Sequence, residues 1–384
     1  MTLIASFEAN GYPLLLGDIL VTYERAQKCT ASHEIAIPLL RGDPNLGRSG
    51  RIVARTTQKV IVPHPHLCMA WAGIEVAARG IAKDLRQYLM GKAFLERDDL
   101  RDWIFQRTAG YRRDELDLIF YWKVGDSVEG ASNIRPIMDP GMPECRIGGS
   151  GDKVFINHLN KLRRTIKPPE LSDYQWTRSA IGSVAGLMGA EQRFNKTGLD
   201  DGWGGAFEMV QFDGNRFRKV GPTLFFYWIF DRKPDGSYHA RLQPDFTYHY
   251  YSGEDAVFWI DQPENNLLLM VTPIDNPPER DLEPLPEILR PYVYAFCFTF
   301  SDRPDDVGCY FQTRAKGAEV DIQIIRKANN VSELQWSRHL LPDFFEAAGD
   351  GEIALNVTSV TMWGPEFSWP SPPNRIEGNM PVHD

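Results

Sequence analysis

Clustered positive charge and long apolar segments are both scarce in this sequence. The formal net charge is −9 and no long Lys/Arg run occurs, so the chain has no broad basic surface of the kind that binds nucleic-acid phosphates. No stretch of about 18 uncharged apolar residues is present, which excludes a transmembrane helix. The apolar run at 14–20 contains Asp18 and has no basic segment before it, so we interpret it as mature structure and not as a signal peptide. We therefore expect neither a nucleic-acid nor a membrane partner.

Paired cysteines are also missing. The five cysteines are odd in number and scattered, and none belongs to a CxxC pair. This usage favours a reducing cytoplasm and predicts neither a disulfide framework nor a zinc site. His64 and His66 alternate with prolines, but no carboxylate or third histidine lies at ligand spacing, so we favour a turn over a metal site. We expect neither a metal nor another cofactor.

The 384 residues, of which 43% are hydrophobic and 24% charged, are enough for two packed cores. We predict a first domain over residues 1–221, with an insertion at about 28–50 that is broken by several Pro and Gly. A β-rich second domain of unknown role is predicted over 222–364. Residues 365–384 are typical of a loose tail.

The chain opens with a predicted β-hairpin. Two apolar-rich runs, 2–9 and 12–23, flank Asn10-Gly11, and Asn-Gly favours a tight turn because both turn positions need positive φ. After Gly73 the apolar spacing changes to that of a helix, and a second, more charged helical stretch is predicted over 97–120.

Two further helices are predicted, from about 148 to 163 and from 174 to 194, before a hairpin whose turn is Asp213-Gly214. The order is therefore strands, helices, helices, strands, which suits two helical layers enclosing a sandwich of two sheets. The rest of the chain is β-rich and aromatic, with strands predicted at 224–230, 256–260, 267–272, 292–300, 308–313 and 320–325.

An ordered series of polar residues and glycines in the first half carries the functional signal. It consists of Thr2-Leu3-Ile4, Gly17-Asp18, Thr22, Lys59-Val60, Ala70-Trp71-Ala72-Gly73, Gly149-Ser150-Gly151, and Asp200 before Gly204-Gly205. The series resembles the proteasome β-subunit family of N-terminal-nucleophile (Ntn) hydrolases, over a little more than half of the chain. The resemblance implies a four-layer α-β-β-α domain and threonine-type peptidase or amidase activity on a peptide or amide substrate. It also allows a homo-oligomeric ring.

The chemistry of that family explains the residue types. A threonine hydroxyl needs a base, and at a chain terminus its own α-amino group, with an ordinary pKa of about 7.7–8.0, can serve. We therefore expect Thr2 to be the nucleophile once Met1 is removed. By the resemblance, Lys59 favours the neutral amine and stabilises alkoxide character on the Thr2 oxygen, while Asp18 holds and balances the Lys59 ammonium.

The resemblance also implies supporting roles for four other residues. The backbone N–H near Ala70 would face the developing oxyanion, and Thr22 would hydrogen-bond an extended substrate. Ser150 and Asp200 would support the N-terminal amine and a catalytic water.

The sequence departs from the family pattern in three places. Extra residues between Asp18 and Lys59 leave Lys28 as a rival for the catalytic lysine, while Ala70 and Trp203 stand where the family has glycine and serine. The alternative function is therefore a catalytically inactive scaffold or binding protein with the same fold. The two are separated by the reaction of Thr2 with a threonine-directed electrophile.

Overall fold

The structure is a computed structural model. It describes residues 2–9, 12–24, 51–92, 95–112, 115–137, 144–157, 203–232, 238–261, 266–275, 294–301, 307–313, 322–326, 332–336, 353–355 and 361–362. The chain divides into two compact units, of which unit 1 comprises Met1–Val220, Tyr251–Val257 and Leu269–Asp281. Unit 2 comprises Gly221–Tyr250, Phe258–Leu268 and Leu282–Asp384. The predicted division at 221/222 keeps 251–257 and 269–281 with the second domain, whereas these two segments belong to unit 1.

One antiparallel sheet of unit 1 has five strands, in the order β11-β10-β2-β1-β9. Its strands are β1 (Leu3–Ala9), β2 (Tyr12–Asp18), β9 (Glu144–Gly149), β10 (Phe207–Phe212) and β11 (Phe217–Lys219). The hairpin predicted at Asn10-Gly11 is confirmed, because Ala9 pairs with Tyr12 across a two-residue connection. The second predicted run is split, however: β2 ends at Asp18, and β3 (Leu20–Glu24) pairs with β4 (Arg51–Thr56) instead.

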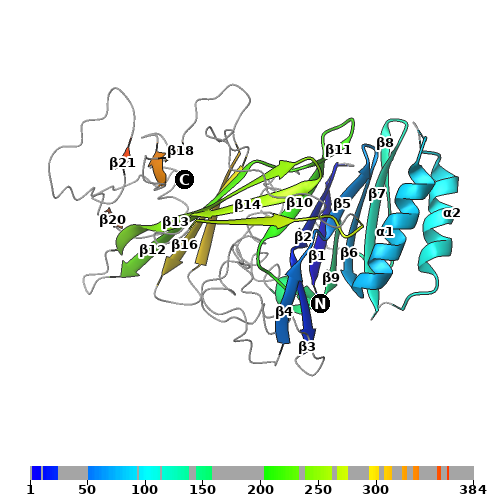
Figure 1. Cartoon of the computed structure of the whole chain (residues 1–384), viewed down its shortest axis with the longest axis horizontal. Helices are drawn as coiled ribbons and strands as arrows, with labels where there is room; N and C mark the ends of the chain where they lie inside the picture. The colour runs from blue at the N-terminus through cyan, green and yellow to red at the C-terminus, as the bar shows by residue number, and fades with distance from the viewer. Residues whose placement is uncertain are drawn as a thin grey trace, which may run out of the picture. The chain divides into compact units, whose positions relative to one another are not determined.

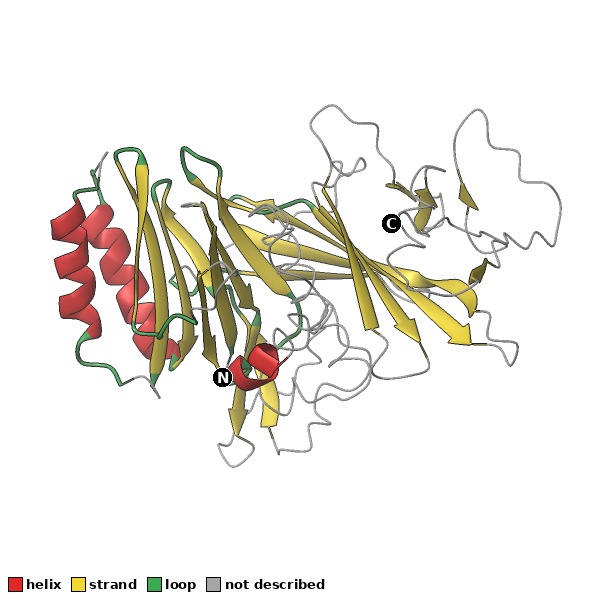
Figure 2. Ribbon diagram, turned by 180° about the vertical axis from the view of Figure 1, so that it is seen from behind, coloured by secondary structure: helices red, strands yellow, loops and turns green. Residues whose placement is uncertain are grey.

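A second sheet of unit 1 has four strands, in the order β5-β6-β7-β8. Its strands are β5 (Val60–His64), β6 (Leu67–Gly73), β7 (Leu116–Val124) and β8 (Ser127–Ser132). Two helices, α1 (Glu75–Leu89) and α2 (Arg97–Thr108), cover one face of this sheet (Figures 1 and 2). Its other face packs on the five-stranded sheet, since one buried cluster includes Ile4 and Leu15 together with Val60, Ala70 and Ile119. Unit 1 therefore layers helices, sheet and sheet.

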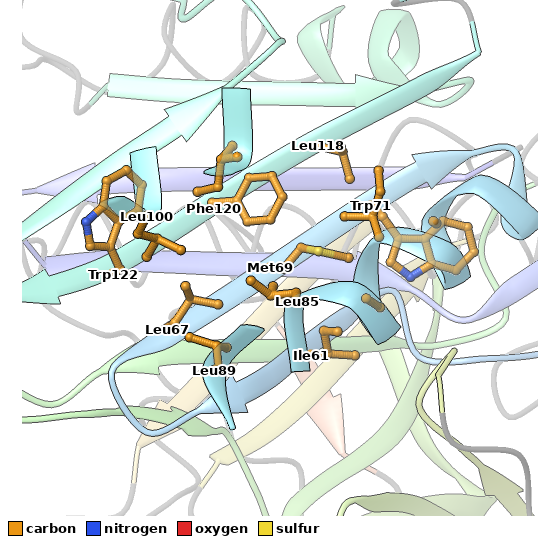
Figure 3. Packing of buried hydrophobic residues seen from close by; sticks show 14 of the residues in the cluster. Ile61, Leu67, Met69, Trp71, Leu85, Leu89, Leu100, Leu118, Phe120 and Trp122 are labelled. Atoms are coloured by element: carbon orange, nitrogen blue, oxygen red, sulfur yellow. The ribbon is translucent and has the colours of Figure 1, made fainter. Parts of the chain in front are cut away.

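The core between the helices and the four-stranded sheet is apolar and tightly filled. Figure 3 shows how Leu85 and Leu89 of α1 and Leu100 of α2 lie among Met69 and Phe120 of the strands. On α1 the buried residues recur at the spacing of one helical face, Ala78, Ile81, Ala82, Leu85 and Leu89. Burial of this face holds the helix on the sheet, since propensity alone gives short helices little stability.

The predicted second helix, 97–120, is wrong in its second half. Helix α2 ends at Thr108, and residues from Leu116 form strand β7. Gly110 follows the end of the helix, and the segment LDLIFYWKV is rich in the aromatic and β-branched residues that favour strands. Most of β7 is buried, because the strand lies between the helices and the other sheet.

The four-layer α-β-β-α domain expected from the resemblance is also wrong. The described residues are strand-rich and form mostly antiparallel sheets with three helices, namely α1, α2 and a short helix at 152–157. Among these residues only α1 and α2 form a helical layer, and it lies on one side. Within the described chain, apolar residues recur at helical spacing mainly after Gly73, and most other apolar runs form strands. The helix predicted over 174–194 lies outside the described residues.

The remaining strands belong mostly to unit 2. A seven-stranded sheet contains β12 (Thr223–Arg232), β13 (Tyr238–Ser252), β14 (Asp255–Asp261), β15 (Asn266–Val271), β16 (Tyr294–Ser301), β17 (Val307–Thr313) and β20 (Ile353–Leu355). A three-stranded sheet contains β18 (Ile322–Arg326), β19 (Ser332–Trp336) and β21 (Thr361–Met362). The six strands predicted beyond residue 222 are all present, whereas β13, β19, β20 and β21 were not predicted. No described helix is long and apolar enough to cross a membrane.

Candidate active site

Thr2 and Lys59, which are 57 residues apart in the sequence, are in direct contact. The Lys59 Nζ donates hydrogen bonds to Thr2 Oγ1 and, at 2.8 Å, to the carbonyl of Leu20. Thr2 directly precedes β1 and Lys59 directly precedes β5, so each residue is fixed by the start of a strand. Both are fully buried, and the Lys59 Nζ lies 4.5 Å from the ring centroid of Trp71, within cation–π range.

Asp18 joins the start of β1 to the segment that precedes β10. The register Ile4↔Gly17 brings the end of β2 beside the start of β1. Asp18 Oδ1 accepts the backbone N–H of Leu3 at 3.1 Å, and Oδ2 accepts the backbone N–H of Gly204 at 2.7 Å. The carboxylate thus fixes the residue that follows Thr2 while remaining close enough to Lys59 to affect its ionisation.

Burial brings the pKa values of Lys59 and Asp18 toward each other. It lowers the pKa of Lys59 to about 8, against the Asp18 charge that raises it, and Arg55 lowers it further. Burial raises the pKa of Asp18 to about 6, against Lys59 and the N–H groups of Gly204 and Leu3 that lower it. Both groups therefore titrate within about two units of neutrality, a property that buried charges show most often at functional sites.

Two glycines allow the close approach of the strands that carry these groups. A Cβ on Gly17 would lie 2.7 Å from Val60 Cγ2 and 2.9 Å from Lys59 Cβ. Gly149 has a φ of +88°, and a Cβ there would lie 1.9 Å from the carbonyl oxygen of Thr2. A larger residue at Gly17 would push β2 away from the segment that bears Lys59. A larger residue at Gly149 would push β9 away from Thr2 at the start of β1.

The other predicted site residues are placed less favourably. Ser150 Oγ lies 3.5 Å from the carbonyl oxygen of Thr2, which is at the limit of a hydrogen bond. Thr22 Oγ1 is buried on β3 and has no hydrogen-bond partner in the described part of the chain. Asp200 and the rival Lys28 lie outside the described residues.

Ala70 is not positioned as the resemblance implies. It lies in the middle of β6, paired with Val60 on one side and Ile119 on the other. Trp71 N–H donates to the Lys59 carbonyl at 3.0 Å, and successive N–H groups of a strand point to opposite sides. The N–H of Ala70 therefore points toward β7 and away from the side of the strand that bears Lys59.

Three contributions to the site were not predicted. The Leu20 carbonyl accepts from Lys59, the Gly204 N–H donates to Asp18, and the Arg55 charge affects Lys59. Backbone groups leave no signal in a sequence, although Gly204 was noted as one of a glycine pair. Trp203, where the family has serine, is buried, and its ring lies 3.1 Å from where a Cβ on Gly151 would be; its indole Nε1 has no hydrogen-bond partner within the described chain.

The comparisons with known proteins give no family. No protein-family model matches this chain, and no curated protein matches it. Among the described residues, no group of three or more His, Cys, Asp or Glu side chains is placed to hold a metal ion. The site therefore consists of a hydroxyl and an amine in contact, with a carboxylate nearby. Such a set can activate a nucleophile by proton transfer.

Proposed function

We propose that this protein is a threonine-type N-terminal-nucleophile hydrolase that cleaves peptide or amide bonds through an acyl-enzyme on Thr2. The observation that carries the proposal is the buried contact between Lys59 Nζ and Thr2 Oγ1. A buried ammonium is costly unless it is paired, and here it contacts the Thr2 hydroxyl. The proposed reaction is that of Ntn hydrolases, whereas the described fold differs from their four-layer domain.

The reaction follows from the groups present. The Thr2 hydroxyl attacks the substrate carbonyl, its proton passes to the α-amino group of Thr2, and the Lys59 ammonium stabilises the negative charge that develops on the Thr2 oxygen. The C–N bond then breaks, and the leaving amine takes the proton from the α-ammonium. Water attacks the resulting Thr2 ester by the same proton transfers, which releases the acid and restores the enzyme.

The ionisation of Lys59 suits this role. With a pKa lowered to about 8, Lys59 is mostly an ammonium at neutral pH, and its positive charge disfavours protonation of the nearby α-amine. The Asp18 carboxylate, which raises the pKa of Lys59, maintains that charge. The mechanism requires a free α-amino group on Thr2, so Met1 must be absent from the active protein.

The second candidate function is a non-catalytic scaffold or binding protein. The complete burial of Thr2 favours it, because a substrate can reach a fully buried hydroxyl only after local opening. In this alternative, Thr2, Lys59 and Asp18 form a polar cluster that only holds β1, β2 and β5 together. The reducing cytoplasm indicated by the cysteines and a homo-oligomeric ring are compatible with either function.

Reaction with a β-lactone, an electrophile that acylates nucleophilic threonine, separates the two functions by intact mass. The hydrolase should gain one acyl group, Thr2→Ser should retain the reaction, and Thr2→Ala should lose it while remaining folded. An adduct that persists in Thr2→Ala would place the nucleophile elsewhere. Folded protein that begins at Thr2 and gains no adduct would favour the scaffold.

A further inference from the structure

A second, partly buried lysine lies beside the segment that carries Lys59. Lys219 Nζ, on β11, donates to Gln58 Oε1 at 2.9 Å, to Glu208 Oε1 at 2.9 Å and to the carbonyl of Val60. These three acceptors match the three donors of an ammonium. Glu208, on β10, is fully buried, and it also accepts from Tyr251 Oη at 3.2 Å. Lys219 thus bonds to the residues on both sides of Lys59.

Gln58 uses every one of its polar groups in a hydrogen bond. Its Nε2 donates to the carbonyls of Glu254 at 2.7 Å and Val271 at 2.8 Å, while its Oε1 accepts from Lys219. Its backbone N–H donates to Thr272 at 3.0 Å, and its carbonyl accepts from the indole of Trp71 at 3.1 Å. These partners belong to unit 1, so the segments 251–257 and 269–281 fix the residue before Lys59.

The backbone on either side of Lys59 has little freedom as a result. The Thr57 N–H donates to the Ile19 carbonyl at 2.9 Å. The Lys59 carbonyl accepts from the Trp71 N–H, and the Val60 carbonyl accepts from Lys219 Nζ. The Lys59 side chain contacts Thr2, whereas the Gln58 side chain contacts Lys219. The Lys219 network therefore anchors the segment while Lys59 reaches the hydroxyl.

We propose that Lys219 and Gln58 are positioning residues that hold Lys59 Nζ against the Thr2 hydroxyl. The catalytic consequence rests on the proposed function, but the placement of Lys59 does not. Removal of the Lys219 ammonium releases Gln58 Oε1 and the Val60 carbonyl together. Lys59 then shifts relative to Thr2, and displacement of a catalytic group by about 1 Å reduces rate by about 100-fold.

The charges around the two lysines make this placement measurable. Lys59 is affected by Asp18 on β2 and Arg55 on β4, in addition to its burial. Lys219 faces Glu208, Glu254 and Cys68, and burial lowers its pKa. Because the pKa of Lys59 depends on its own burial and on its distance from Asp18, a change in its titration reports displacement of its Nζ.

The experiment is NMR of the lysine Nζ resonances in protein labelled with [15N]lysine, followed from pH 6 to pH 10. Lys219→Met alone would leave Glu208 as an unpaired buried carboxylate, so the test variant is Lys219→Met with Glu208→Gln. Glu208→Gln alone is the matched control, because it keeps an oxygen acceptor for Lys219. Lys83→Met, at an exposed position of α1, controls for loss of one lysine signal.

The Lys59 resonance should keep its position and midpoint in both control variants. In the double variant its midpoint should move by about one pH unit, and acylation of Thr2 by the β-lactone should slow by about 10- to 100-fold. An unchanged Lys59 resonance in the folded double variant would overturn the positioning role. So would a double variant that does not fold where Glu208→Gln folds, because Lys219 would then serve the fold. Absence of acylation in the wild type refutes the proposed function and leaves the NMR result to decide the positioning role.

Discussion

Replacement of Lys59 by methionine should separate its chemical role from its effect on stability. The change removes the Nζ hydrogen bonds to Thr2 Oγ1 and to the Leu20 carbonyl, each worth about 1 kcal/mol. It also removes a buried charge whose pKa falls from an ordinary 10.5 to about 8. At about 1.4 kcal/mol per pH unit, that difference means that the charged form of Lys59 destabilises the folded state by on the order of 3 kcal/mol. These opposing effects leave the variant within about 2 kcal/mol of the wild type at pH 7.

The difference in unfolding free energy between the wild type and Lys59→Met should depend on pH. Between the folded pKa of about 8 and the ordinary 10.5, the unfolded chain binds more protons at Lys59 than the folded chain does. The wild type should therefore gain stability as pH rises, by up to about 3 kcal/mol, and Lys59→Met should not. Asp18 in the variant loses the charge that lowers its pKa, so its folded pKa rises above about 6. The variant should then lose stability as pH rises through that value.

Urea unfolding followed by tryptophan fluorescence at pH 6, 7, 8, 9 and 10 measures this difference. The free energy of unfolding of Lys59→Met should fall progressively below that of the wild type as pH increases, while Lys83→Met should follow the wild type. Acylation of Thr2 in Lys59→Met should slow by orders of magnitude at pH 7 and recover partly at higher pH, because the α-amine then loses its proton. Parallel plots of unfolding free energy against pH for Lys59→Met and the wild type would refute the assignment of Lys59 as a buried lysine with a lowered pKa.

Three other substitutions have definite expected results. Asp18→Asn removes the charge that raises the pKa of Lys59 and one acceptor for the N–H of Leu3 or Gly204, so acylation should slow and urea unfolding should show a loss of about 1–3 kcal/mol. In Lys28→Met, Thr2 should be acylated at close to the wild-type rate. Loss of acylation in Lys28→Met together with normal acylation in Lys59→Met would show that Lys28, and not Lys59, is the catalytic lysine. Leu85→Ala, at a fully buried position of α1, should lower the free energy of unfolding by about 2–5 kcal/mol without moving the Lys59 Nζ resonance.

The sequence predicted the parts of the site that depend on local geometry. Asn10-Gly11 fixes a two-residue hairpin, and the hairpin brings the residue after Thr2 beside Asp18. Lys59 was assigned by the resemblance, with its position at the start of a strand favouring it over Lys28, and the structure puts its Nζ on Thr2 Oγ1. The hairpin inference holds because turn chemistry and strand pairing constrain nearby residues strongly.

Other features depend on contacts that no local pattern encodes. Gln58 bonds to the Glu254 carbonyl across 196 positions and to that of Val271 across 213, so its role was invisible in the sequence. Ala70 was assigned to the oxyanion by position in a motif, whereas the direction of its N–H is set by pairing on both sides of β6. The helix predicted through residue 120 failed because burial between layers made LDLIFYWKV a strand.

The central claim is that Thr2 is the nucleophile and that its own amine is the base. The most direct test is to locate the β-lactone adduct by tandem mass spectrometry in two forms of the protein, one beginning at Thr2 and one retaining Met1. The account predicts a single acyl group on Thr2 in the first form and none in the second, in which the amine is blocked by a peptide bond. Equal acylation of Thr2 in both forms, or an adduct on any other residue, would contradict it.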